Sequence, residues 1–309
     1  MTTRGSCADQ SGIAQARGTS RGLDQSIYSA EAVTFIRALM AREASPKLRN
    51  PDNLARVFLG LKWRVLLLPH AIVRRLVERL APGCCGYHVI RTNRGDELLL
   101  RSLKSGTRQV VILGAGNDTR AYRFREELRG ARIFELDFPG TQRKKKSFLP
   151  VGLPSDHVAF VATDFNSDSW EQDLLRAGYD RNCRTFFSWE GVCYFLPRQS
   201  AERVLQFVSE NSAPGSELFF DYSLASFVNG DDSTYGASIL RRWNEKVGEP
   251  HLFGLTEESV TILVESQGMR VVSDLGPIEA EALYLTRSGR NRVRPYGMFR
   301  LVHAAVERP

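Results

Sequence analysis

The sequence lacks any run of apolar residues long enough to cross a bilayer. Its longest apolar stretches, such as residues 65–68, are bounded by Arg, Lys, Pro or His, whereas a spanning helix needs about 20 consecutive apolar residues. These stretches cannot span a bilayer, which disfavours a transmembrane protein, and we expect no membrane partner.

Cysteine and histidine are scarce, and neither forms a recognisable motif. The five cysteines contain no CxxC pair, and an odd number is a poor basis for a disulfide framework, so we expect reduced thiols in a cytoplasmic protein. The five histidines are far apart and form neither HxH nor HExxH. We expect no metal site.

The composition is that of a large globular protein. With 309 residues, 42% of them hydrophobic, the chain can bury a sizeable core. The net charge of +7 permits an anionic partner, but no basic stripe interleaved with aromatic residues is present, so nucleic acid is not indicated. The densest basic run, residues 143–146, follows Asp137 and Pro139 closely, and we expect it to form the solvated first turn of a helix.

The chain divides into an N-terminal helical part and an α/β part. Residues 1–22 are rich in Ser, Thr, Gly and Arg, and we expect a disordered tail there, followed by a single domain over residues 23–309. Between residues 29 and 103 apolar side chains recur at helical spacing, with breaks at Pro46, Pro51 and Pro82. Residues 23–105 are therefore predicted to form a helical cap.

From residue 106 onward, short β-branched or aromatic runs alternate with helix-length polar stretches, which predicts a mostly parallel sheet in an α/β fold. The strand candidates are residues 110–113, 133–136, 158–162, 185–189 and 218–222, with 270–272 and 298–304 as an antiparallel ending. The interval 223–267 after the fifth strand is longer than a plain crossover requires. It is either a lid or substrate pocket, or a surface insertion without function.

The segment 110–123 reads VVILGAGNDTRAYR and places a tight glycine turn after the first predicted strand. Gly114, Ala115 and Gly116 allow a ligand to approach the backbone near the next helix. Position 119 is Thr, so the third glycine of a dinucleotide fingerprint is missing. Asp118 can cap the helix, and its charge disfavours a phosphate beside it. The turn therefore favours a nucleoside without phosphates.

Acidic residues follow three later strands. Either Glu135 or Asp137, at the end of the second strand, could bind ribose hydroxyls. Asp164 with Phe165 follows the third strand and suits an adenine amino group and ring, and Glu190 follows the fourth. S-adenosylmethionine has a ribose, an exocyclic amine and a positive sulfonium without phosphate, and it would use all of these acids.

Taken together, these residues resemble the leucine carboxyl methyltransferase family, which includes bacterial polyketide O-methyltransferases of the tetracenomycin type. The resemblance runs from about Ser29 to the C-terminus and rests on motifs in a fixed order. They are Gly114-x-Gly116-x-Asp118-Thr119-Arg120-x-x-Arg123, Phe134-Glu135-Leu136-Asp137-x-Pro139, Glu190-Gly191-x-x-Tyr194-x-Leu196 and Gly248-Glu249-Pro250-x-x-Phe253-Gly254. It implies a class I methyltransferase fold with a Rossmann-like sheet and S-adenosylmethionine as cofactor.

The resemblance also implies roles for single residues. Arg91 would pair with the methionine carboxylate of the cofactor, with Arg94 as the rival position. Gly114 would face the methionine portion, Asp137 the ribose and Glu190 the amino end of the cofactor. Asp164 and Phe165 would contact the adenine, and the cofactor-binding set is completed by Ala115, Gly116 and Phe138.

The remaining expectations concern the methyl acceptor. Methyl transfer is an in-line displacement, so a carboxylate acceptor, already ionised near pH 7, needs no general base. A phenol or alcohol would benefit from one, and the candidates are Tyr194, Tyr222 and His251. Arg123, Tyr194 and Tyr222 are the candidate substrate residues, although Arg120 and Arg123 could equally form structural ion pairs with an acid such as Asp118.

We expect an O-methyltransferase acting on an acidic or phenolic small molecule, such as a polyketide-like natural product. The alternative acceptor is a macromolecule, either a protein C-terminus or a modified tRNA base. A binding module that has lost activity and an NAD oxidoreductase are further hypotheses. The intact set of acids argues against the first of these, and Thr119 with Asp118 argues against the second.

Overall fold

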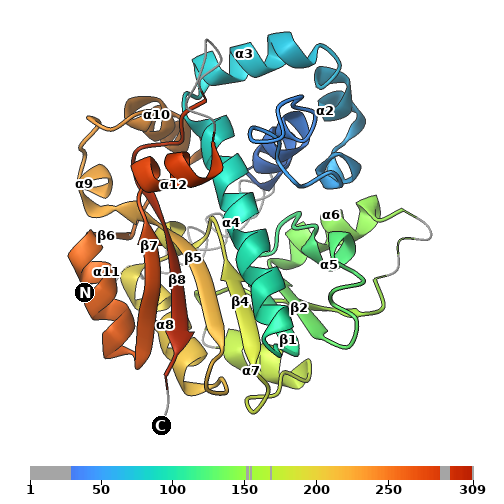
Figure 1. Ribbon diagram of the computed structural model, residues 1–309, viewed down its shortest axis with the longest axis vertical. Helices are drawn as coiled ribbons and strands as arrows, with labels where there is room; N and C mark the ends of the chain where they lie inside the picture. The colour runs from blue at the N-terminus through green and yellow to red at the C-terminus, as the bar shows by residue number, and fades with distance from the viewer. Residues whose placement is uncertain (1–28, 151–152, 154, 168, 286–292, 308–309) are drawn as a thin grey trace, which may run out of the picture.

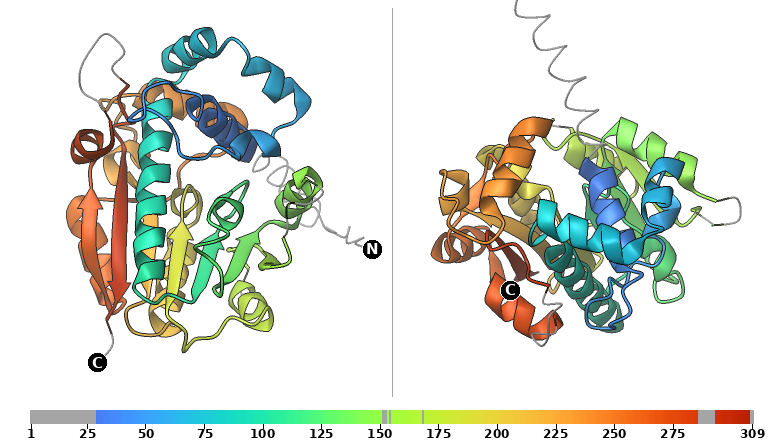
Figure 2. Two further views of the ribbon diagram at one scale, coloured as in Figure 1. Left: turned by 45° about the vertical axis from the view of Figure 1, so that its right-hand side comes forward. Right: turned by 90° about the horizontal axis from the view of Figure 1, so that it is seen from above.

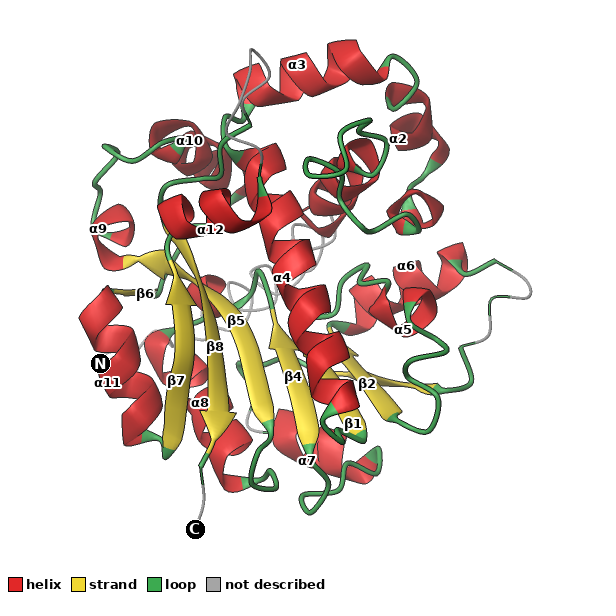
Figure 3. Cartoon of the chain, in the orientation of Figure 1, coloured by secondary structure: helices red, strands yellow, loops and turns green. Residues whose placement is uncertain are grey.

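A single mixed sheet organises the protein. The computed structural model describes residues 29–150, 153, 155–167, 169–285 and 293–307, so the expected tail over residues 1–22 lies outside the described residues. The sheet has eight strands, of which seven follow the order β3-β2-β1-β4-β5-β8-β7, while β6 pairs with β5 (Figure 3). The bounds are β1 Gln109–Leu113, β2 Arg132–Asp137, β3 Val158–Ala162, β4 Thr185–Trp189, β5 Glu217–Leu224, β6 Gly254–Leu255, β7 Met269–Leu275 and β8 Phe299–Val306.

The predicted strands are confirmed. β3 and β4 begin and end at the predicted residues, and the other predicted strands overlap their observed counterparts. Every residue of β1 and β4 is buried, because helices cover both faces of the sheet centre. β8 runs antiparallel to both β5 and β7, as expected for the end of the chain. The parallel strands therefore bring their carboxyl ends to one edge of the sheet.

Helices precede the sheet in the chain, as the periodicity predicts. Residues 29–40 are helical, and the following elements are η1 Ala55–Phe58, α2 Leu61–Leu66, α3 His70–Leu80 and α4 Cys84–Lys104. Pro46, Pro51 and Pro82 all lie between helices. Figure 1 shows the long helix α4 crossing in front of the sheet, while the shorter helices stand above the carboxyl ends of the parallel strands.

Further helices connect the strands. They are α5 Arg120–Arg123, α6 Pro139–Phe148, α7 Trp170–Arg176, η2 Cys193–Phe195, α8 Arg198–Glu210 and α12 Pro277–Tyr284. The interval 223–267 contains α9 Ala225–Val228, α10 Ala237–Val247, β6 and α11 Glu257–Ser266. Because α11 packs against β7, it serves as the ordinary crossover helix, and the additional structure is confined to α9, α10 and β6. In the part of the chain that the structure describes, no helix is both long and apolar enough to cross a membrane.

The basic run at residues 143–146 is helical, as predicted, but α6 begins at Pro139, so the run lies beyond the first turn. The expectation that the run is solvated is also wrong for one residue. Lys145 is 1% exposed, and its Nζ lies 2.6 Å from Oε2 of Glu135. The rings of Phe58 and Tyr122 cover the same ammonium group. One lysine of the run therefore compensates a buried carboxylate of β2.

We predict that Lys145→Met lowers the free energy of unfolding by about 3–5 kcal/mol, because it leaves the Glu135 carboxylate buried without a partner. The double variant Lys145→Met, Glu135→Leu should recover most of this loss, since it removes both charges. Urea unfolding measures the free energies of unfolding of the single and the double variant. The control is Arg143→Met, on the exposed side of α6. A loss below about 1 kcal/mol in the single variant would contradict this account.

Candidate cofactor site

The glycine turn after β1 adopts a backbone that requires glycine. Gly114 and Gly116 have φ values of +73° and +47°, in the left-handed region that L side chains rarely occupy. A Cβ atom on Gly114 would also overlap Cγ2 of Val192, which follows β4. The backbone N–H groups of Gly114 and Ala115 both donate to the carbonyl of Leu136 at 2.9 Å. The turn is thus fixed between the ends of β2 and β4.

Asp137 ends β2 directly beside this turn. Its carboxylate accepts hydrogen bonds from the backbone N–H of Gly116, at 2.5 Å, and of Phe138, at 2.7 Å. Burial raises the pKa of Asp137, and the two N–H donors act in the opposite direction. By sequence, either Glu135 or Asp137 could bind the ribose hydroxyls. In the structure, the Glu135 side chain is fully buried against Lys145. Asp137 is therefore the acid placed at the edge of the sheet.

The acids after β3 and β4 reach the same edge. Asp137 pairs with Ala162 across the parallel ladder, which places Asp164 just beyond it. The Asp164 side chain accepts from the N–H of Asn166 at 2.9 Å, and the buried Phe165 packs edge-on against Trp170. The carboxylate of Glu190 accepts from the hydroxyl of Ser188 at 2.7 Å.

Arg120 is the centre of a buried ion-pair chain. Its guanidinium lies 2.8 Å from Asp96, 2.8 Å from Asp118 and 2.6 Å from Glu190, and its side chain is 4% exposed. The N–H of Arg120, the first residue of α5, also donates to Asp118 at 2.7 Å, although the N-cap residue of this helix is Thr119. Burial raises the pKa of Asp118, but Arg120, Lys145 and Arg37 together lower it to about 2.

The chain of charges continues into the helical cap. Arg123 lies 2.6 Å from Asp96 and 3.6 Å from Asp52, and Asp52 lies 3.1 Å from Arg37. Thr119 also donates to Asp52 at 2.6 Å. Arg120 and Arg123 thus both form the structural ion pairs that the sequence offered as an alternative. The substrate role of Arg123 stays a prediction.

Arg91 extends the chain of charges on the other side. It lies within α4, where Nη1 is 2.8 Å from Asp221 and Nε is 3.5 Å from Glu190. Its guanidinium carbon lies 5.2 Å from the centre of the Tyr87 ring, so Arg91 is a buried residue near the ends of β4 and β5. The rival Arg94 instead donates to Ser273 of β7 at 2.9 Å.

Asp221 is the main residue that sequence reasoning missed. It is fully buried in β5, and its carboxylate accepts from Arg91, from the hydroxyl of Tyr87 and from the N–H of Gly191, the last at 2.6 Å. The predicted acids follow strand ends, whereas Asp221 stands inside the apolar run Phe-Phe-Asp-Tyr. An acidic residue within an apolar strand indicates a buried ion pair, because a buried charge requires a partner, and this pattern could have identified Asp221. Asp52 and Asp96 were also missed.

The candidate bases fall into two groups. The rings of Tyr194 and His251 lie 4.4 Å apart, and His251 Nδ1 is 3.0 Å from the hydroxyl of Ser223. Burial lowers the pKa of His251 to about 3 and raises that of Tyr194. Tyr222 lies apart from them, because it follows Asp221 on the strand and faces the other side of the sheet. Its hydroxyl donates to Asp274 at 2.9 Å.

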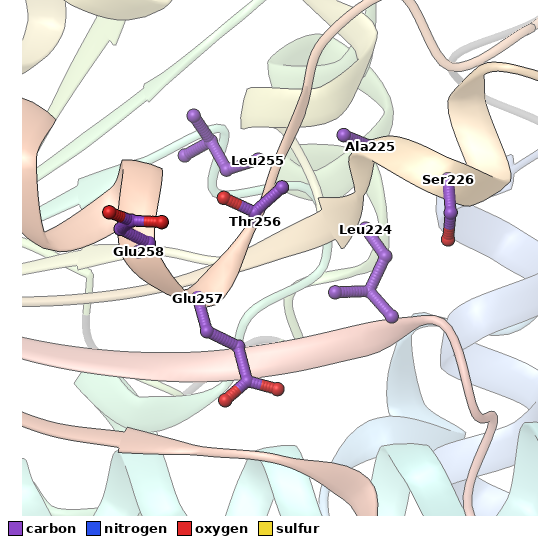
Figure 4. Close-up of a pocket in the computed structure, with 7 residues that line it drawn as sticks. All are labelled: Leu224, Ala225, Ser226, Leu255, Thr256, Glu257 and Glu258. Carbon is purple, nitrogen blue, oxygen red and sulfur yellow. The ribbon is translucent and has the colours of Figure 1, made fainter.

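An open pocket of about 390 Å³ lies at the end of β5, beside the N-terminus of α11 (Figure 4). Its lining residues are Leu224, Ala225, Ser226, Leu255, Thr256, Glu257 and Glu258. None of these residues belongs to the predicted cofactor set, and Glu257 is held by Arg300 at 2.7 Å. The candidate cofactor site therefore lies outside this pocket, at the charged groups around the glycine turn. Among the described residues, no three His, Cys, Asp or Glu side chains are placed to hold a metal ion.

We predict that Arg120→Met lowers the free energy of unfolding by about 3–5 kcal/mol, because three carboxylates would face one another without their shared cation. The matched control is Arg129→Met. Arg129 also pairs at 2.6 Å, with Glu126, but its side chain is 79% exposed, so the expected change is below about 0.5 kcal/mol. Chemical denaturation would refute the ion-pair account if the two variants lost equal stability.

Solved structures share the fold. A DUF574 family protein from Streptomyces avermitilis superimposes with a TM-score of 0.60 at 12% identity, covering 89% of this chain and 97% of that one. A structure described as a "putative methyltransferase" from Thermobifida fusca gives a TM-score of 0.53 at 17% identity, covering 82% and 94% of the two chains. At these identities the likeness concerns the fold alone.

Sequence relatives carry the comparison further. The "Putative S-adenosyl-L-methionine-dependent methyltransferase YktD" of Bacillus subtilis is 29% identical over 216 residues, 69% of each chain. A protein of Mycobacterium bovis BCG, described in the same words without a gene symbol, is 33% identical over 227 residues, 70% of this chain and 68% of its own. The sequence model named leucine carboxyl methyltransferase matches residues 30–209. The chain therefore belongs to the leucine carboxyl methyltransferase family, whose cofactor is S-adenosylmethionine.

Proposed function

We propose that this S-adenosylmethionine-dependent methyltransferase is an O-methyltransferase that methylates a carboxylate or hydroxyl of a small, polyketide-like molecule. The description of the family, which names a carboxyl group as methyl acceptor, supports transfer to oxygen. The charge balance at the end of the sheet supports the position of the cofactor. Four guanidiniums and five carboxylates form one connected chain of ion pairs. The net formal charge of this ion-pair chain is therefore −1, and the carboxylate of Asp137 lies beside the glycine turn.

These residues fit the cofactor. A negative surplus suits a positively charged sulfonium, whereas Asp118 beside the glycine turn would repel the phosphates of a dinucleotide. Asp137 would bind the ribose, Asp164 and Phe165 the adenine, and Glu190 the amino group. When bound, the cofactor supplies an electrophilic methyl group on sulfur.

Arg91 is suited to binding the carboxylate of the cofactor. Asp221 fixes one edge of its guanidinium at 2.8 Å, while the contact with Glu190 is longer, at 3.5 Å. A guanidinium oriented in this way can bind a carboxylate through two parallel hydrogen bonds. Asp221 therefore acts as a positioning residue for Arg91, and it holds the backbone of Gly191 through the same carboxylate.

For a carboxylate acceptor, the protein aligns the reactants and excludes water, and it moves no proton. Such an acceptor is already ionised near neutral pH, so it would need no base to accept a methyl group. The buried rings of Tyr194 and Phe299 and the half-buried ring of His251 pack against one another. They lie beside the ion-paired Arg91 and Asp221 and would exclude water from them. Such surroundings favour a reaction in which opposite charges are neutralised.

We predict that Asp137→Asn and Arg91→Ala each weaken the binding of S-adenosylhomocysteine at least tenfold, because each removes a charged hydrogen-bond partner of the ligand. Isothermal titration calorimetry measures the affinities. Asp156→Asn is the control, since its side chain is 86% exposed. Unchanged affinity in both site variants, with unfolding midpoints near that of the wild type, would overturn the site assignment.

For a carboxylate acceptor, we predict no inflection of kcat/KM between about pH 5 and pH 8, since His251 is neutral above a pKa of about 3 and no base is required. Tyr194→Phe should then lower kcat by less than about threefold. A transfer assay with a tritiated methyl group measures both. A loss of about a hundredfold or more would identify Tyr194 as a base and favour a phenolic acceptor.

A macromolecular acceptor is the second candidate function, and the net charge of +7 is the observation that favours it. Transfer to a tRNA base would require phosphate contacts, so tRNA binding would weaken steeply as salt rises. Binding of a protein C-terminus would not weaken steeply with salt in this way. A methyl-transfer screen over aromatic acids, phenols, tRNA and peptide C-termini separates these acceptors.

A further inference from the structure

Helices α2 and α3 carry an unusual number of exposed apolar side chains. In α3, Ile72, Leu76 and Leu80 are 67%, 51% and 62% exposed, and they recur every fourth residue along one side. Leu61 and Val65 repeat the same spacing in α2. The full set, which we call the α2–α3 apolar face, is Leu61, Val65, Leu66, Leu68, Ile72, Leu76 and Leu80.

The apolar face is not needed to attach α3 to the protein. A different side of the helix, with Val73 and Val77, packs against the core. His70 and Arg74 bind the neighbouring segment through the carbonyl of Leu39 and the carboxylate of Glu43. A surface helix normally has one apolar side directed inward and a polar side directed to solvent. Here the outer side of α3 is apolar as well.

Cations flank this face. At 100° per residue, Arg75 and Arg79 lie beside Ile72 on the outer side of α3, and Lys62 and Arg64 are exposed on α2. Glu78 is the only acidic residue between positions 61 and 80. Within the described ranges, no carboxylate pairs with Lys62, Arg75 or Arg79. The face therefore combines apolar side chains with uncompensated positive charge.

We propose that the α2–α3 apolar face binds to the surface of an anionic lipid bilayer, with α3 lying in the plane of the interface. Leucine and isoleucine on one side, with Arg and Lys at its margin, form the pattern by which amphipathic helices bury a few ångströms into the headgroup region. Each cation near such a surface contributes about 1 kcal/mol of attraction. The earlier expectation of no membrane partner rested on spanning segments, and a surface-bound helix needs none.

Charge complementarity selects this occupant over two others. A second copy packed symmetrically on the same face would bring Arg75 and Arg79 of both copies together. Residues 1–28 hold three arginines and two aspartates, so by sequence they offer no acidic complement. An anionic bilayer supplies both an apolar layer and negative charge.

The position of the face fits this role. Seen from above, α2 and α3 lie over the end of the molecule that holds the carboxyl ends of the parallel strands (Figure 2). Figure 1 shows α3 at the outer edge of that end. Binding through α3 would direct the candidate cofactor site toward the bilayer.

The test is sedimentation of the full chain with vesicles of phosphatidylcholine containing phosphatidylglycerol, and with vesicles of phosphatidylcholine alone. We expect binding to the anionic vesicles that weakens as salt is added. The double variant Ile72→Asp, Leu76→Asp should weaken it by about tenfold or more. Arg75→Gln with Arg79→Gln should weaken it by about fivefold for each charge removed.

The control is Ile262→Asp on α11, because Ile262 is 61% exposed and lies outside the proposed face. Circular dichroism verifies that each variant is folded, and S-adenosylhomocysteine affinity should equal that of the wild type in all of them. Equal vesicle binding by the wild type and the Ile72→Asp, Leu76→Asp variant would overturn the proposal. A lipid-free dimer that this variant dissociates would assign the face to a second copy and overturn it as well.

Discussion

The packing of Arg120 against three carboxylates is the constraint on which the rest of the site depends. Burying a charge is costly unless it is paired, so Asp96, Asp118 and Glu190 must remain around one guanidinium. These acids come from α4, the glycine turn and the loop after β4. Through Arg123 and Asp52 the same ion pairs reach the helical cap, and through Arg91 they reach β5. These buried ion pairs therefore fix the positions of the helical cap, the glycine turn and the sheet relative to one another.

The sequence was sufficient to predict the strands and the acids at their ends, for a physical reason. A buried strand in a parallel sheet is a short apolar run, and its carboxyl end is marked by the first polar residues that follow. Asp137 and Glu190 were found in this way. Asp221 was not, because it lies inside a strand rather than after one. Its position in an apolar run indicates that it needs a partner, but the partner, Arg91, is 130 residues away in the sequence.

Lys145 illustrates the opposite difficulty. Within a run of four cations, composition alone indicates solvent exposure, but a helix turns only one position of such a run inward. The way α6 packs on the sheet determines which of the four side chains points inward. It is Lys145, which pairs with Glu135 of β2. The same buried pair favours Asp137 over Glu135 for the proposed contact with the ribose, because the Glu135 carboxylate is already neutralised by Lys145.

The surplus of carboxylates along the ion-pair chain also bears on turnover. A sulfonium is positively charged, whereas the thioether that remains after methyl transfer is neutral. At the proposed site, attraction to the net negative surroundings would exist before the reaction and disappear with it. The charged groups that hold the fold together would thus favour exchange of spent cofactor for fresh cofactor, and they would limit inhibition by the product.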